Sequence, residues 1–289
     1  MSEQLLCRPP VTSDEPFHYR LTSLIRLPAP SGRGILNEAT LFHEAQTLRV
    51  SWQSATVDSR LKRGCLVALR GVQSKPLEDD CLRIGRLELL DKPVASLNPF
   101  QTVPSTWVTD RDTVQRAAIL WEQLNRPFQH LLNAVLWDGG RFFRYVTGPA
   151  SMADYPWAPG SNFRQAVSTA EQAAQLTRGL EAVSPSVVIA AALLHSAGKA
   201  DDYRLSVAGY ELSERGYWIG SQHTILEWLA VARAQVIVPE TQYLALVHAL
   251  IAARGQAANG QSTEAAILAV ANRLSGQMSP ALSTTASRS

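Results

Sequence analysis

The strongest constraint on the fold is an uninterrupted apolar run, Val187 to Leu194, which leads directly to a histidine, His195. A helix that is apolar on every side has to be buried on every side, so the run predicts a central helix over residues 184–197. Gly198 and Lys199 follow and end it. The run is far shorter than the ~20 residues of a membrane span, so we expect no membrane partner.

Composition limits the possible classes of protein. The chain has 289 residues, of which 46% are hydrophobic and 18% are charged, enough for one large domain or two ordinary ones. The formal net charge of +2 is too small to indicate nucleic-acid binding by itself, so any such surface must be local. Cys7, Cys65 and Cys81 lack the spacing of metal ligands, and the N-terminus lacks an export signal, so we expect reduced thiols in a cytoplasmic protein.

Hydrophobic periodicity changes along the chain, from strand-like in the first third to helical in the second half. The pattern predicts an α+β multidomain protein, with a small N-terminal β-barrel followed by an all-α domain. We expect an extended lead-in over residues 1–33, the barrel over 34–96, a linker with helices over 97–160, the helical domain over 161–278 and a disordered tail over 279–289.

Within the barrel region, residues 47–52 alternate cleanly and end on Trp52, residues 55–61 could form a short helix, and residues 65–71 and 81–90 are predicted strands. This order, with the phrase Leu61-Lys-Arg-Gly-Cys-Leu-Val67, resembles an OB-fold. The resemblance implies binding of single-stranded nucleic acid. The alternative is an ordinary solvated barrel surface. The candidate contacts are Arg49, Trp52, Arg60, Lys62, Arg63 and Arg70.

The phrase His195-Ser196-Ala197-Gly198-Lys199, after the apolar run, resembles the His-Asp-x-Gly-Lys signature of the HD phosphohydrolase superfamily. Together with the barrel, the chain resembles the YhaM-type 3′–5′ exoribonucleases, and its second half resembles the HD region of TraI-type conjugative relaxases. The resemblance implies a helical domain whose histidines and carboxylates hold divalent metal, which activates a water molecule for attack on a phosphate.

The chain departs from that ligand pattern at four positions. Gln165 and Ser221 stand where the family has histidines, and Ser196 and Asn272 stand where it has aspartates. Neutral amides and hydroxyls cannot neutralise a divalent cation, so we expect no metal, no other cofactor and no hydrolysis. A divalent metal held by an unusual ligand set is the alternative.

Two positive side chains remain near this region. The resemblance puts Lys199 near substrate phosphate, and Arg254 replaces a family histidine, so both are candidate phosphate ligands. The alternatives are that Lys199 caps the helix and that His195 is a hydrogen-bonded core histidine. The aromatics Tyr155 and Trp157 could stack on bases or pack in the core.

These features predict a catalytically inactive HD-like protein that binds single-stranded nucleic acid or a nucleic-acid-processing protein. The relaxase resemblance makes mobile-element or DNA-transfer biology a reasonable context. One alternative is a metal-dependent 3′–5′ exonuclease or phosphohydrolase. A second is an assembly protein with protein contacts only. Because YhaM-type proteins form oligomers, we also expect a homo-oligomer.

Overall fold

The computed structural model describes residues 18–44, 46–73, 81–151, 159–207, 209–253 and 261–278. The chain divides into two compact units, Met1–Asp91 and Lys92–Ser289, called the sheet unit and the helical unit below. Together they confirm the α+β arrangement expected from the sequence. In the described ranges, no helix combines the length and the apolar character needed to cross a membrane.

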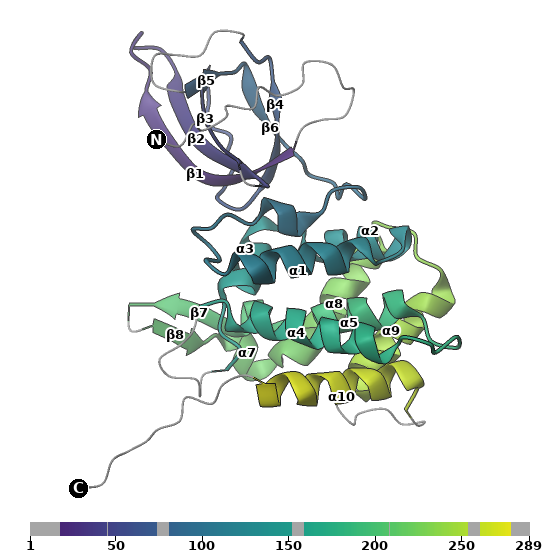
Figure 1. Cartoon of the computed structure of the whole chain (residues 1–289). Coiled ribbons are helices and arrows are strands. Elements are labelled where there is room, and N and C mark those ends of the chain that lie inside the picture. The colour runs from purple at the N-terminus through teal and green to yellow at the C-terminus, as the bar shows by residue number, and fades with distance from the viewer. Residues whose placement is uncertain are drawn as a thin grey trace, which may run out of the picture. The chain divides into compact units, whose positions relative to one another are not determined.

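The sheet unit is a curled six-stranded sheet with the strand order β5-β3-β2-β1-β4-β6 (Figure 1). The first three strands form an antiparallel meander, and β4 pairs with the outer side of β1. The strands are β1 (His18–Pro28), β2 (Ile35–His43), β3 (Gln46–Ser54), β4 (Leu66–Arg70), β5 (Cys81–Arg83) and β6 (Arg86–Leu89).

One short segment, residues 81–89, contacts both edges of this sheet. Its first part, β5, pairs in parallel with β3, and its second part, β6, pairs antiparallel with β4. At the junction, the N–H of Ile84 donates to Ser51 O at 3.0 Å and the N–H of Gly85 donates to Arg70 O at 2.9 Å. A Cβ on Gly85 would lie 3.1 Å from Arg70 O, so the close approach favours glycine there.

Side chains that alternate along the strands fill the inside of the curled sheet. Leu21, Leu41 and Val50 are fully buried, and Trp52 is 5% exposed. Arg20 is also fully buried, and its Nη1 donates to Gly64 O at 2.8 Å. Because burial disfavours the charged form, it lowers the pKa of Arg20.

Three expectations for this unit need correction. The sheet begins at His18, inside the expected lead-in of residues 1–33. Residues 55–61 form turns instead of a short helix; there Asp58 accepts hydrogen bonds from the backbone N–H and the side chain of Arg60. The expected strand over 81–90 is two strands, because its backbone changes partner at Ile84 and Gly85.

The helical unit is built around α5 (Pro185–Leu194), and every residue from Ser186 to Leu194 is buried. Ser184 caps the helix by accepting a hydrogen bond from Val187 N–H, and Pro185 occupies its first turn. The other helices are η1 (Pro99–Thr102), α1 (Arg111–Glu122), α2 (Arg126–Leu136), α3 (Gly139–Thr147), α4 (Ser161–Leu176), α6 (Lys199–Asp202), α7 (Glu214–Trp218), α8 (Gly220–Arg233), α9 (Glu240–Ala252) and α10 (Thr263–Met278).

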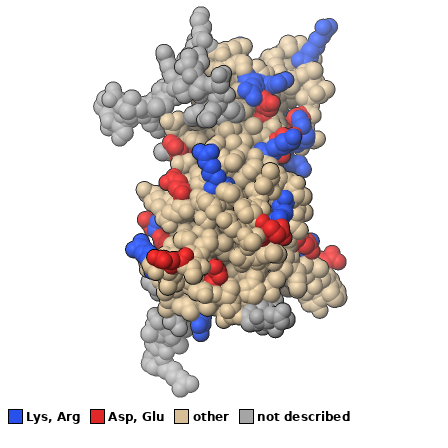
Figure 2. All heavy atoms as spheres, turned by 90° about the vertical axis from the view of Figure 1, so that its right-hand side faces the viewer, with Lys and Arg blue, Asp and Glu red and all other residues tan. Residues whose placement is uncertain are grey.

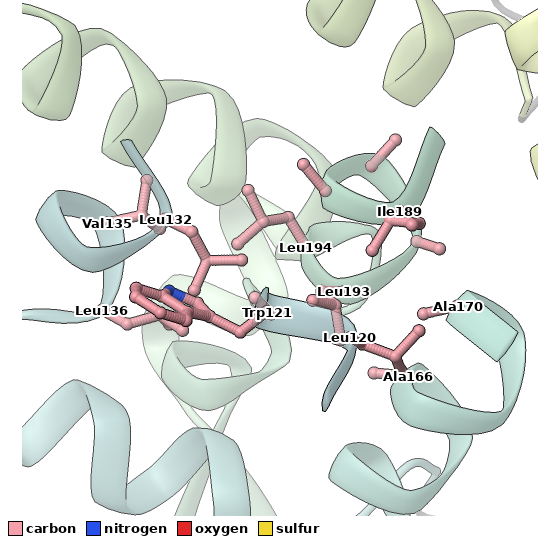
Figure 3. Close-up of a cluster of buried hydrophobic side chains, with 14 of the residues drawn as sticks. Leu120, Trp121, Leu132, Val135, Leu136, Ala166, Ala170, Ile189, Leu193 and Leu194 are labelled. Carbon is pink, nitrogen blue, oxygen red and sulfur yellow. The ribbon is translucent and has the colours of Figure 1, made fainter. Parts of the chain in front are cut away.

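Helices α2, α4, α9 and α10 all contact α5. Each buried Leu or Ile contributes roughly 1.5–3 kcal/mol relative to exposure, so α5 is a main source of the unit's stability. The central buried helix expected from the apolar run is therefore confirmed. Figure 3 shows Ile189, Leu193 and Leu194 of α5 among Leu120 and Trp121 of α1, Leu132, Val135 and Leu136 of α2, and Ala166 and Ala170 of α4.

One expectation for the helical unit also needs correction. The unit is not all-α, because a β-hairpin of β7 (Tyr203–Ser206) and β8 (Gly209–Leu212) follows α6 and projects from the helices (Figure 1). Strands of four residues are too short to give a clear alternating pattern. Gly139 and Gly140 begin α3, because Asp138 caps it by accepting from Arg141 N–H at 2.7 Å.

Candidate functional site

A row of neutral polar side chains, called the polar seam below, runs between α4, α10 and the end of α5. Its three members on α4, Asn162, Gln165 and Thr169, are three and four residues apart, so they lie on one face of that helix. Gln165 Nε2 donates to Asn272 Oδ1 at 3.5 Å, so two of the four departures from the HD pattern lie in contact. The seam consists of Asn162, Gln165 and Thr169 on α4, Ser196 after α5, and Asn272 and Ser275 on α10.

The lower part of the seam is fully hydrogen-bonded. The hydroxyls of Thr169 and Ser275 lie 2.7 Å apart. Each hydroxyl has one hydrogen, which it can donate either to the other hydroxyl or to a carbonyl of its own helix: Thr169 Oγ1 lies 2.8 Å from Gln165 O, and Ser275 Oγ lies 3.0 Å from Asn272 O. These bonds fasten α4 to α10 at a buried position.

The upper part of the seam contains two polar atoms without partners among the described residues: Asn162 Oδ1 and Ser196 Oγ. Both side chains are 1% exposed. They are neighbours, because Asn162 Nδ2 donates to Ser196 O at 3.3 Å. A buried polar atom without a partner costs roughly 1–3 kcal/mol, so this end of the seam is a local source of instability.

The seam's donor set does not fit a divalent cation. Its side chains are amides and hydroxyls, which supply no negative charge to offset two positive charges in a buried place. Gln165, Ser196 and Asn272 contribute only neutral oxygen or nitrogen atoms. Across the described ranges, no group of three or more His, Cys, Asp or Glu side chains could hold a metal ion.

His195 ends α5 and is 8% exposed. Its Nδ1 lies 2.6 Å from Ala192 O. Since a carbonyl oxygen can only accept, Nδ1 carries a proton and donates it in this hydrogen bond. The ring lines a small cleft together with Gln222, His223 and Leu250. His195 is thus hydrogen-bonded within the core, in agreement with the simpler of its two interpretations.

The remaining departure, Ser221, lies on the first turn of α8, beside Gly198. A Cβ on Gly198 would lie 2.1 Å from Ser221 O, so this contact requires glycine. Asp202 is 7% exposed, and its Oδ1 has no hydrogen-bond partner among the described residues. Burial raises the pKa of Asp202, and the neighbouring Ser221 lowers it by a smaller amount.

The two candidate phosphate ligands have different outcomes. Lys199 is half-buried, and its Nζ donates to Ala150 O at 2.6 Å, so it fastens the residues after α3 to α6. It does not cap α5. Arg254 lies outside the described residues, as do Tyr155 and Trp157. Lys199 is thus the one candidate whose surroundings are known, and its ammonium group already holds a backbone carbonyl.

In the sheet unit, the predicted nucleic-acid contacts separate into three groups. Trp52 is buried in the core, so its ring is closed off from solvent. Arg60 and Arg70 are exposed but form ion pairs, with Asp58 and with Glu88 respectively. The last group is exposed; it comprises Arg49 on β3 and Lys62 and Arg63 in the turn before β4.

Two further arginines were missing from the predicted contacts. Arg83 on β5 and Arg86 on β6 are both exposed, on the segment that joins the two sheet edges. In the strand pairing, Arg83 lies opposite Ser51 and Arg86 lies opposite Arg70. The inward positions of Leu82 and Ile84 would have identified Arg83 as outward from the sequence. We call Arg49, Arg83, Arg86 and Arg70 the basic strip.

The basic strip is local. On the face drawn in Figure 2, Lys and Arg side chains are interspersed with Asp and Glu, with wide uncharged areas between them.

Comparisons of the chain with protein-family models, with curated proteins and with solved structures give no match.

Proposed function

We propose that the sheet unit is an OB-type barrel that binds single-stranded nucleic acid, and that the helical unit is an HD-like domain that does not hydrolyse phosphates. The observation that carries the first part is the connectivity of the sheet. Strands β1, β2 and β3 form a meander, and β4 pairs with β1. Segment 81–89 then pairs with β3 on one side and with β4 on the other. A small barrel with this connectivity is typical of the OB-fold.

The basic strip supports nucleic acid as the ligand. All four of its arginines are exposed, and they lie on β3, on β4 and on segment 81–89, which pairs with both strands and so brings charges far apart in sequence onto neighbouring strands. The glutamate paired with Arg70, Glu88, offsets one of the four charges. A strip with an excess of arginines can follow the phosphate backbone of a single strand.

The polar seam supports the absence of metal-dependent hydrolysis. Three of the four departures from the HD ligand pattern, Gln165, Ser196 and Asn272, belong to one hydrogen-bonded row between α4, α5 and α10. Amides and hydroxyls that bond to each other and to the backbone stabilise helix packing without a cation. The rival proposal, an exonuclease with an unusual ligand set, requires a metal that this neutral row does not favour.

Salt-dependent binding to a labelled 20-nucleotide oligo-dT or oligo-U, followed by fluorescence anisotropy, tests the proposal. If the strip neutralises about four phosphates, log K should fall with log salt at a slope of about −2.8, which is roughly a 50-fold loss between 50 and 200 mM. The double variant Arg49→Ala/Arg83→Ala should reduce the slope by about 1.4. Arg178→Ala, an exposed arginine on the helical unit, is the matched control and should bind like the parent.

Three results would contradict the proposal. Binding that is absent at 50 mM salt would remove nucleic acid as a ligand and favour an assembly protein. A slope that falls equally in the Arg178→Ala control would show that the strip is not the contact surface. Metal bound at one equivalent in the purified protein, and lost in Gln165→Ala, would replace the non-hydrolytic assignment with the exonuclease.

A further inference from the structure

The β7–β8 hairpin and α7, the helix after it, carry large apolar side chains that are mostly exposed to solvent. Leu205 on β7 is 73% exposed, Trp218 at the end of α7 is 72% exposed, and its neighbour Tyr217 is 69% exposed. The rings of Tyr217 and Trp218 meet edge to face, with centroids 4.8 Å apart. Exposed aromatic and aliphatic side chains close together in the chain are typical of interaction surfaces. We call Leu205, Val207, Leu212, Tyr217, Trp218 and Ile219 the apolar patch.

The hairpin also presents an open strand edge. Within the described part of the chain, β7 and β8 pair only with each other. The hydroxyl of Tyr210 on β8 donates to Thr147 O at 3.4 Å, which connects that strand to the helices. On β7, Arg204 and Leu205 are exposed. A two-stranded hairpin is marginally stable alone, and an open edge is a template for another strand.

The charges around the patch are neutralised internally. Arg204 Nε lies 2.7 Å from Glu211 Oε1 across the hairpin. Arg215 on α7 forms an ion pair with Glu227 on α8. Because each positive charge has its own negative neighbour, the surface gives no net attraction for a strongly charged partner such as nucleic acid. The same balance lets the surface meet a copy of itself without repulsion.

We propose that β7 pairs with β7 of a second copy of this chain across a two-fold axis, which makes a four-stranded antiparallel sheet and buries the apolar patch. A strand that meets its own copy across such an axis is antiparallel automatically. The register that sets Leu205 opposite the same residue of the second copy sets Arg204 opposite Ser206. Apolar then faces apolar, and no like charges lie directly opposite.

The size of the patch agrees with this partner. A Trp or Tyr side chain buries ~150–250 Å² when covered, so at their exposures Tyr217 and Trp218 can contribute roughly 200–350 Å² per copy. A stable interface needs about 800 Å² per partner. The rest comes from the aliphatic members of the patch and from the paired strands, so the hairpin and α7 supply a surface of the right order.

Sedimentation velocity of the full chain, over a concentration series from about 0.1 to 100 µM, tests this inference. We expect a dimer that dissociates with dilution. Leu205→Arg should weaken the dimer at least 100-fold, because it places two buried charges opposite each other. Trp218→Ser should weaken it at least tenfold. Ile237→Arg is the matched control, since Ile237 is 92% exposed and lies outside the patch. It should leave the dimer unchanged.

Each possible result decides the inference. A parent chain that stays monomeric at 100 µM would overturn it, and so would a dimer that survives both Leu205→Arg and Trp218→Ser. Equal weakening by Ile237→Arg would show that added charge, wherever it lies, disturbs the assembly. Circular dichroism of each variant checks that the helices are retained. The test is independent of nucleic-acid binding, because the basic strip belongs to the sheet unit.

Discussion

Two buried serines of the polar seam should respond in opposite ways to the same substitution. Ser196 and Ser275 are 1% and 2% exposed. The hydroxyl of Ser196 has no partner among the described residues, whereas that of Ser275 bonds to Thr169 Oγ1 and Asn272 O. Ser196→Ala therefore removes an unsatisfied group, and Ser275→Ala removes two hydrogen bonds.

The magnitudes follow from these contacts. Relief of a buried unsatisfied hydroxyl returns roughly 1–3 kcal/mol, less the packing lost with the oxygen, so Ser196→Ala should raise the unfolding free energy by about 1 kcal/mol. In Ser275→Ala, two lost bonds cost roughly 1–3 kcal/mol, and the better helix propensity of alanine returns ~0.5 kcal/mol. We expect this variant to be less stable by about 1 kcal/mol, a difference of about 2 kcal/mol between the two.

Urea unfolding followed by tryptophan fluorescence measures both variants. Six of the seven tryptophans lie in the helical unit, so the signal reports that unit. In a thermal scan the two variants should be separated by roughly 4–8 °C. The reasoning is refuted if Ser196→Ala loses more than about 1 kcal/mol. That result would mean that the hydroxyl is bonded in solution, for example to a buried water bridging it to Asn162.

Three other outcomes follow from the same structure. Gly198→Ala should lower the unfolding free energy by about 3 kcal/mol or more, because its Cβ would collide with Ser221 O, whereas Gly276→Ala, with open space around it in α10, should be neutral or stabilising in the same urea assay. Burial raises the pKa of Asp202, so the folded protein releases this proton at a higher pH than the unfolded chain does. The free energy of unfolding therefore falls as the pH rises through that pKa. Asp202→Asn lacks this fall, so its stability relative to the parent should increase as the pH rises above the ordinary pKa of an aspartate; a constant difference would contradict the assignment. Arg20→Ala should destabilise the sheet unit by about 3 kcal/mol, because it leaves a cavity beside Gly64 O; far-UV circular dichroism during unfolding measures this, and an unchanged midpoint would show that the core closes over the site.

Local pattern was enough for the elements that carry a strong period. The apolar run before His195 predicted the buried helix α5, and the alternation up to Trp52 predicted strand β3. The inward side of Trp52 also follows from that alternation, and its burial removes it from the predicted nucleic-acid contacts. The hairpin of β7 and β8 escaped prediction because its short strands give little period and depend on contacts with the helices.

The sequence by itself determined the order of a β region and a helical region, the helix that has to be central, and the neutral character of the residues that the HD resemblance places at ligand positions. Only the tertiary structure decided which of those residues meet. Gln165 and Asn272 are 107 residues apart and come into contact because α4 packs on α10. Segment 81–89 pairs with both β3 and β4, which are separate in the chain. This pairing alone puts Arg83 and Arg86 beside Arg49 and Arg70. Periodicity reports which side of an element is buried, but the partner of that side is chosen by packing over the whole chain.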